Sequence, residues 1–228
     1  MQERLARKLD LELILSKIKP HPSPSSALEQ YTISADTAAT MLYLAAYANR
    51  DIINKDILDL GCGTGRLALG AAFLGAKSVV GVDIDTKAVK MANQNASDVG
   101  LKNKVQWVAG SLQSIGGVFD TVLQNPPFGV QKRGADREFL KEALRLGKKI
   151  YSLHKRPGRD SDLMRELKSS GEGVLAVSAS PFLERLVEKN GGRVEAAFAL
   201  VMTIPHMFEF HFERRHETIV DLYVMKKQ

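Results

Sequence analysis

From residue 56 onward, the apolar positions of this chain alternate between two kinds of segment. Short apolar or β-branched runs are separated by longer segments whose apolar residues recur every three to four positions, which is the pattern of strands alternating with helices. Such alternation predicts an α/β fold with a mostly parallel seven-stranded sheet, helices on both faces and an antiparallel edge strand. The predicted strands are Asp56–Leu60, Ser78–Val82, Val105–Ala109, Thr121–Gln124, Lys149–Leu153, Arg193–Ile204 and His216–Val224. The predicted helices are Leu67–Leu74, Thr86–Val99, Ala135–Leu146 and Pro181–Asn190.

The first fifty residues have a different pattern. Met1–Ile18 and Ser34–Tyr47 have helical spacing, and the proline- and serine-rich stretch His21–Ser26 separates them. We therefore expect residues 1–50 to form a helical extension that packs on a core domain of residues 51–228.

Length and composition restrict the class of protein. The chain has 228 residues, of which 44% are hydrophobic and 25% charged, so it can form one folded domain with a real core. No apolar run approaches the roughly 18 residues of a membrane span, and the charged N-terminus does not read as a secretory signal. The single cysteine, Cys62, excludes an intramolecular disulfide framework, and His206, His211 and His216 lack metal-ligand spacing. We expect a soluble cytoplasmic protein without a bound metal.

Positive charge is concentrated in one stretch. The formal net charge is +6, and residues 131–168 alone hold twelve basic and six acidic residues. A local positive field favours a polyanionic partner such as nucleic acid, although a solvated helix face of mixed charge fits this feature about as well. Residues 156–179 overlap the end of this stretch and contain some of its basic residues.

A glycine-rich turn follows the first predicted strand. Asp59-Leu60-Gly61-Cys62-Gly63-Thr64-Gly65 joins that strand to a helix, where glycines let the backbone approach a ligand closely. A dinucleotide fingerprint needs a third glycine at position 66, which is Arg66 here. The spacing G-x-G-x-G after an acid is instead typical of methyltransferases that use S-adenosylmethionine (SAM). Asp59 suits the cationic methionine end of that cofactor and would repel a pyrophosphate.

The next strand ends in a second acid. Asp83 follows Val79–Val82, 22 positions after Gly61, and a carboxylate there can bind both hydroxyls of a ribose. Asp85 is expected to cap the following helix.

Asn125-Pro126-Pro127-Phe128 follows the fourth predicted strand, at the sheet edge where ligands bind in open parallel sheets. An exocyclic amine on a base or amide is a poor nucleophile because its lone pair is delocalised. The Asn125 side chain and the Pro126 carbonyl can accept hydrogen bonds from such an amine, while the prolines fix the backbone and Phe128 offers a ring for stacking. We assign the catalytic role to Asn125, Pro126, Pro127 and Phe128.

The two motifs resemble those of a known protein family. They are similar to the motifs of Rossmann-like class I amino-methyltransferases, and four segments are similar to the methyltransferase-like protein five family and its archaeal relatives. Those enzymes place N6-methyladenosine in small-subunit ribosomal RNA, and some pair with a small zinc-binding activator subunit. The segments are Leu28–Tyr31, Gly81–Asp85, Asn125–Gly129 and Tyr151–Lys155. Compared with those relatives, residues 156–179 form a longer segment, which implies a basic insertion that either contacts RNA or is a surface loop.

The resemblance also implies site residues. Gln30 and Thr32 would close over SAM from the N-terminal side, and Ser111 stands where relatives tend to have an acid near the adenine. With the two motifs, the predicted cofactor residues are Gln30, Thr32, Asp59, Gly61, Gly63, Thr64, Gly65, Asp83, Ser111 and Asn125. For the RNA we expect contacts from Phe128, Lys132, Arg133, His154, Lys155 and Arg156, with helix capping as an equal alternative for His154.

The predicted activity is methyl transfer from SAM to the N6 amine of adenosine in structured RNA. The same asparagine motif serves DNA adenine and protein glutamine methylation, so these substrates stay open. A SAM-retaining RNA-binding scaffold is the non-enzymatic alternative, although a scaffold has no need to keep both Asp83 and Asn125.

Overall fold

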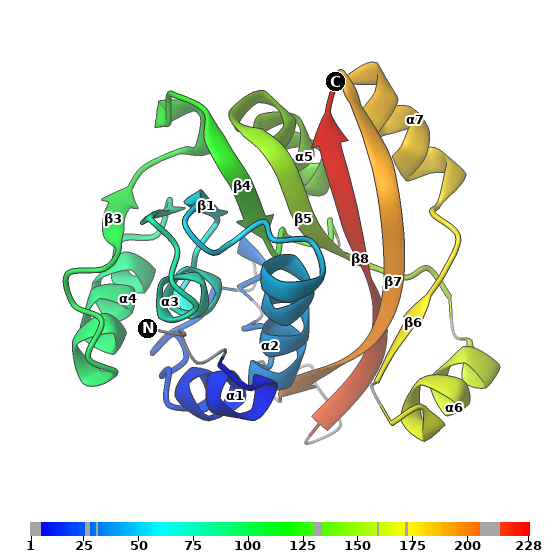
Figure 1. The fold of residues 1–228 in the computed structure, drawn as a ribbon, viewed down its shortest axis with the longest axis horizontal. Helices are drawn as coiled ribbons and strands as arrows, with labels where there is room; N and C mark the ends of the chain where they lie inside the picture. The colour runs from blue at the N-terminus through cyan, green and yellow to red at the C-terminus, as the bar shows by residue number, and fades with distance from the viewer. Residues whose placement is uncertain are drawn as a thin grey trace.

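The computed structural model describes residues 6–25, 28–30, 32–129, 134–158, 160–171, 173–205 and 215–228. Within these residues the strands form one eight-stranded sheet in the order β3-β2-β1-β4-β5-β8-β7-β6 (Figure 1). Strands β1 to β5 run parallel, and β8, β7 and β6 continue the sheet with antiparallel pairing. The strands are β1 (Asp56–Leu60), β2 (Ser78–Asp83), β3 (Gln106–Ala109), β4 (Phe119–Gln124), β5 (Gly147–Lys155), β6 (Val174–Ala176), β7 (Gly192–Pro205) and β8 (Arg215–Lys227).

The predicted fold class is confirmed, with one more strand than expected. The additional strand is β6, whose three residues pair with β7 in the segment interpreted as a basic insertion. A run of three residues is too short to give a period-2 signal, and its strand conformation depends on the neighbouring β7. The same segment contains helix α6 (Ser161–Ser169).

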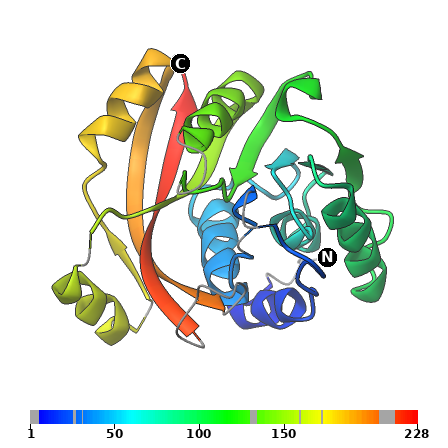
Figure 2. The same cartoon turned by 180° about the vertical axis from the view of Figure 1, so that it is seen from behind.

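Helices cover both faces of the sheet because neighbouring strand residues point to opposite sides. Ile57, Leu123 and Tyr151 face one hydrophobic cluster, while Leu58 and Val122 face the other. Helices α1 to α4 cover the first face and α5 and α7 the second, as the front and back views show (Figures 1 and 2). The helices are α1 (Lys8–Ser16), α2 (Ala35–Tyr43), α3 (Arg66–Phe73), α4 (Thr86–Asp98), α5 (Ala135–Leu146) and α7 (Pro181–Lys189), with a π-helical turn at Leu44–Ala48.

The N-terminal helices share the core of the sheet. Leu11, Leu15 and Leu42 are completely buried in the same cluster as the β1 and β4 side chains. The contact point on α3 is Gly70, where an added Cβ would meet the Leu42 side chain and lie 3.3 Å from Leu15 Cδ2. Only glycine lets α1 and α2 approach α3 this closely. The boundary at residue 50 stays a prediction.

The contact at Gly70 generates a stability prediction. We expect Gly70→Val to lower the free energy of unfolding by about 1–3 kcal/mol, because the side chain overpacks a filled interface. Urea unfolding measures this difference. Gly116→Val is the control, since no atom lies within 4 Å of a Cβ at Gly116. Equal stability of Gly70→Val and the wild type would show that the helices do not pack as described.

A row of buried polar side chains crosses β4 and β5. Gln124 Nε2 donates to Ser152 Oγ at 2.8 Å, and Ser152 Oγ lies 2.8 Å from His154 Nε2. Gln124 and Ser152 are completely buried, and His154 is 8% exposed with its ring edge-on to Tyr223. The expected contact of His154 with RNA is therefore wrong, as is the capping alternative. The His154 side chain is enclosed in the sheet. The sequence did not indicate this burial, because the adjacent Lys155 and Arg156 are basic and suggested an exposed segment.

Burial lowers the pKa of His154 to about 4. A histidine in the unfolded chain has a pKa near 6.5, so between pH 6.5 and 4 its imidazole is protonated in the unfolded chain but neutral in the folded chain. The contribution of His154 to the free energy of unfolding is therefore fully present above pH 6.5. It decreases as the pH falls toward 4, by about 3 kcal/mol in total. We expect His154→Gln to flatten the pH dependence of the unfolding free energy between pH 6.5 and 5. Parallel curves for the variant and the wild type would contradict the burial of a neutral imidazole.

Among the described residues, no helix is long and apolar enough to cross a membrane.

Candidate functional site

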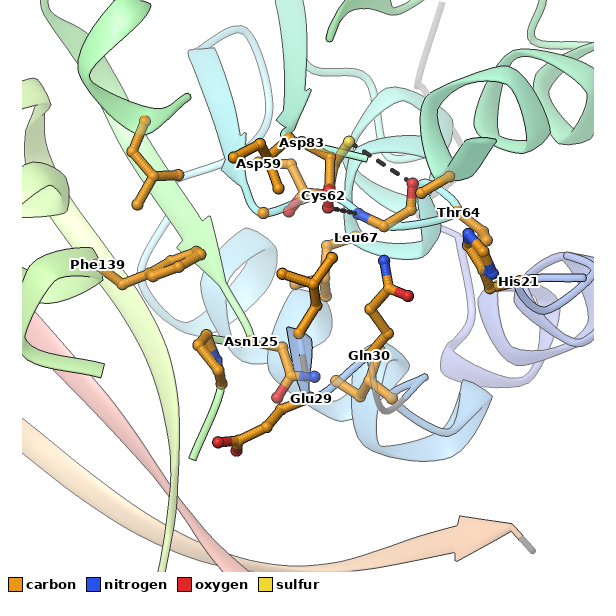
Figure 3. Close-up of a pocket in the computed structure, with 18 of the residues that line it drawn as sticks. His21, Glu29, Gln30, Asp59, Cys62, Thr64, Leu67, Asp83, Asn125 and Phe139 are labelled. Carbon is orange, nitrogen blue, oxygen red and sulfur yellow. Dashed lines mark hydrogen bonds between the residues drawn. The ribbon is translucent and has the colours of Figure 1, made fainter. Parts of the chain in front are cut away.

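A cavity of about 390 Å³ opens where β1, β2 and β4 end. Its wall is made by the glycine turn after β1, the end of β2, the asparagine motif after β4 and the segment before α2 (Figure 3). The sequence predicted most of this wall. The predicted residues that line the cavity are Gln30, Thr32, Asp59, Gly61, Gly63, Thr64, Asp83, Ser111, Asn125 and Pro127.

Two physical constraints favour glycine in this turn: positive φ angles and close packing against neighbouring side chains. Gly61, Gly63 and Gly65 have φ angles of 75°, 53° and 89°, which favour residues without a Cβ. A Cβ at Gly61 would lie 2.6 Å from the Phe139 ring, and one at Gly65 would lie 2.5 Å from Trp107. At Gly63 no atom lies within 4 Å of an added Cβ, so this glycine leaves open space beside the cavity wall. Gly65 serves packing and does not line the cavity.

Two carboxylates flank this turn, Asp59 buried and Asp83 half-buried. Asp59, 1% exposed, accepts a hydrogen bond from the Ala68 N–H at 2.8 Å, and burial with the nearby Asp83 charge raises its pKa to about 7. Asp83 accepts from the Gly63 N–H at 2.8 Å and from the Asp85 N–H at 2.9 Å, and burial raises its pKa as well. Desolvated carboxylates of this kind gain from a cation or a hydroxyl donor in the cavity.

The N-terminal segment is fastened to the end of β2 through Asp85. Asp85 caps α4 by accepting from the Lys87 N–H, and its other oxygen accepts from Gln30 Nε2 at 2.8 Å. His21 Nε2 lies 3.1 Å from that same oxygen, while His21 Nδ1 accepts from the Ser23 N–H. His21 was missed because a lone histidine in a proline-rich stretch carries no spacing signal.

Fewer residues of the asparagine motif line the cavity than the sequence predicted. Asn125 and Pro127 line the cavity, whereas Pro126 is buried and Phe128 packs against the main hydrophobic cluster. The aromatic ring in the wall is Phe139 of α5, shown in Figure 3 across the cavity from Gln30. The stacking role expected of Phe128 stays a prediction, whereas Phe139 is the phenylalanine whose side chain lines the cavity. Helical periodicity predicts that Phe139 belongs to α5, but it does not predict that the Phe139 side chain faces the cavity.

Ion pairs compensate much of the basic stretch. Arg156, expected to contact RNA, pairs with Asp221 at 2.9 Å, whereas Lys155 is exposed. Lys132 and Arg133 lie outside the described residues. The remaining basic residues of the stretch that form described ion pairs are Arg145, Lys148, Lys149, Arg165 and Lys168.

The cavity fits a cationic adenosyl ligand. Asp83 is placed at the end of β2 to accept from two ribose hydroxyls, and the Gly63 backbone leaves room beside it. Ser111 and Leu112 line the cavity beyond β3, where an adenine would lie. Asp59 lines the cavity next to the glycine turn, where its carboxyl group would gain from a cationic ligand. The residues present therefore suit SAM.

Comparison with known proteins agrees with this geometry. The model of the methyltransferase small domain matches residues 33–150. An uncharacterised protein of Methanocaldococcus jannaschii is 34% identical over 235 residues, which cover 98% of this chain and 95% of that protein. The rRNA N(6)-adenosine-methyltransferase METTL5 of Danio rerio is 40% identical over 157 residues, which cover 66% of this chain and 75% of that protein.

A solved structure has the same fold over nearly the whole chain. It is a Pyrococcus horikoshii protein described as a candidate RNA methyltransferase, with a TM-score of 0.80 and 32% identity. The match covers 98% of this chain and 99% of that one. The chain therefore belongs to the methyltransferase small domain family, in the group of that family that includes METTL5.

Proposed function

We propose that this protein transfers a methyl group from SAM to the N6 amine of adenosine in ribosomal RNA. The observation that carries the proposal is the presence of Asn125 and Asp83 in the wall of one cavity. The activity by which its relative METTL5 is named supports the choice of base and of RNA. A binding scaffold would not need an asparagine beside the cofactor position.

SAM, when bound, supplies a methyl group on a positively charged sulfur. Asp83 holds the ribose through its carboxylate, and the Gly63 and Asp85 N–H groups fix the orientation of that carboxylate. Because both carboxylate oxygens accept backbone N–H groups, the side chain does not have to reorient when the cofactor enters.

Asn125 orients the amine that receives the methyl group. Its side-chain oxygen and the Pro126 carbonyl accept the two N–H groups of an adenine amine, which directs the nitrogen lone pair toward the cofactor. Pro126 and Pro127 restrict the backbone, so the two acceptors keep their separation. The methylated amine is acidic enough to release its surplus proton to water, so no general base is required.

The adenine must leave its base stack to enter the cavity. Phe139 presents a ring in the wall against which an extruded base can lie. Extrusion costs least at a loop or helix junction, which favours a structured RNA with unpaired adenosines.

We further propose small-subunit rRNA as the target, a small zinc-binding subunit as a partner and the cytoplasm as the location. The sheet ends at β3 on one side and at β6 on the other within the described residues, so two strand edges are candidates for pairing with another chain. Among the described aromatic residues near the C-terminal end of the chain, Phe182 is 46% exposed and Phe198 packs against the core.

The first test is methyl transfer from labelled SAM to small-subunit rRNA that lacks the modification, followed by nucleoside digestion. We expect label in N6-methyladenosine, and a loss on the order of 100-fold or more in Asn125→Ala because the amine loses an orienting acceptor. Asn93→Ala, which removes an exposed amide on α4, is the matched control and should keep full activity.

Parallel reactions contain DNA and ribosomal protein. Label on either of these with none on RNA would retain the methyltransferase and refute the RNA substrate. An Asn125→Ala variant as active as the wild type would refute the catalytic assignment.

Cofactor binding is tested separately by calorimetry with S-adenosylhomocysteine, the demethylated product. We expect Asp83→Ala to weaken binding about 10- to 100-fold, because the ribose loses a charged acceptor. Asp98→Ala removes a carboxylate that pairs with Lys19 away from the cavity and should bind normally. Unchanged affinity in Asp83→Ala would mean that the ribose lies elsewhere.

A further inference from the structure

Arg66 is a cation at the cavity wall whose partners are all backbone atoms. It is the first residue of α3, where the usual dinucleotide turn has a glycine, and it is half-buried. Its Nη2 donates to the Ile18 carbonyl at 2.9 Å and its Nη1 donates to the Ile33 carbonyl. The Nε–H is buried and has no hydrogen-bond partner.

No carboxylate of the described chain lies within ion-pair distance of this guanidinium. Burial lowers the pKa of Arg66 to about 10, and no neighbouring acid opposes that effect. A guanidinium has five N–H donors in a planar fork, so two carbonyls leave three of them unused. A desolvated cation in this state gains more from an anion than an exposed one does, since less water has to be displaced.

The rest of the cavity wall has the opposite charge. Glu29, Asp59, Asp83 and Glu138 line it, and Arg66 is the only lysine or arginine among the described lining residues. A ligand carboxylate would be repelled near Asp83 and attracted near Arg66. Arg66 and Ile33 both line the cavity, so the guanidinium lies where α3 meets the N-terminal segment at the cavity wall.

We propose that Arg66 binds the carboxylate of the methionine moiety of SAM through its unused N–H groups. This inference rests on the proposed function and adds the residue that recognises the amino-acid end of the cofactor. It also implies a second role for the ligand. Because the same guanidinium holds the Ile18 and Ile33 carbonyls, a bound carboxylate would fasten the N-terminal segment more firmly over the cavity.

The test compares two ligands that differ at the amino-acid end. S-adenosylhomocysteine carries the carboxylate, whereas 5′-methylthioadenosine has the same nucleoside and thioether without the amino-acid group. By calorimetry, we expect Arg66→Met to weaken S-adenosylhomocysteine about 10- to 100-fold and to leave 5′-methylthioadenosine within twofold. Lys102→Met removes an exposed positive charge outside the cavity wall and should change neither affinity.

Further comparisons separate the carboxylate contact from other roles of Arg66. Equal weakening of both ligands would overturn the proposal, because Arg66 would then act only by holding the N-terminal segment. Unchanged binding of both ligands with weaker RNA binding would overturn it in favour of a phosphate contact.

Two measurements guard against a variant that fails to fold. Arg66→Lys keeps the charge without the fork, and we expect it to bind S-adenosylhomocysteine with intermediate affinity. In the wild type, removing only the carboxylate from S-adenosylhomocysteine should weaken binding to a similar extent as Arg66→Met. Equal wild-type affinity for the intact and decarboxylated ligands would refute the contact and leave the proposed function untouched, whereas no binding of any adenosyl ligand would refute both.

Discussion

Asp83 accepts hydrogen bonds from the Gly63 and Asp85 N–H groups, and the arrangement of the site depends on this carboxylate. It joins the turn after β1 to the end of β2, two segments that meet only because their strands pair in parallel. A carboxylate at this position is desolvated, so its negative charge costs free energy until a ligand supplies hydroxyl or cationic groups. The Asp83 carboxylate thus both holds the two segments of the cavity wall together and favours the binding of a ligand with hydroxyl or cationic groups.

The N-terminal segment completes the cavity through similar polar contacts. Gln30 and His21 converge on Asp85, and Arg66 holds two carbonyls of the same segment. Asn95 of α4 is fully buried and links the Thr64 carbonyl of the glycine turn to the backbone of Lys19. These contacts connect the segment to the β1 and β2 ends, while α1 and α2 anchor it through the hydrophobic core. The cofactor position is therefore enclosed by parts of the chain on both sides of the glycine turn.

On the opposite side, rigidity comes from the sheet interior. Gln124 precedes Asn125 and is tied to Ser152 and His154 on the neighbouring strand, within a fully covered part of the sheet. A backbone held on one side by this buried row and on the other by two prolines has little freedom at Asn125. In the proposed reaction, amine orientation requires acceptors in fixed positions, so this row would support the position of Asn125 without contacting the substrate.

The sequence by itself determined the α/β class, the glycine turn, Asp83 and Asn125, because each depends on local pattern: strand and helix periodicity, positive φ angles, and polar residues placed where parallel strands end. Only the tertiary structure decided which aromatic ring faces the cavity, that His154 is enclosed, that β6 adds an eighth strand, and that Arg66 and His21 meet the site. These features depend on which side of an element is covered and on contacts between residues such as Ile18 and Arg66, which are 48 positions apart. Local periodicity carries no information about such contacts, since they are set by how the helices pack on the sheet.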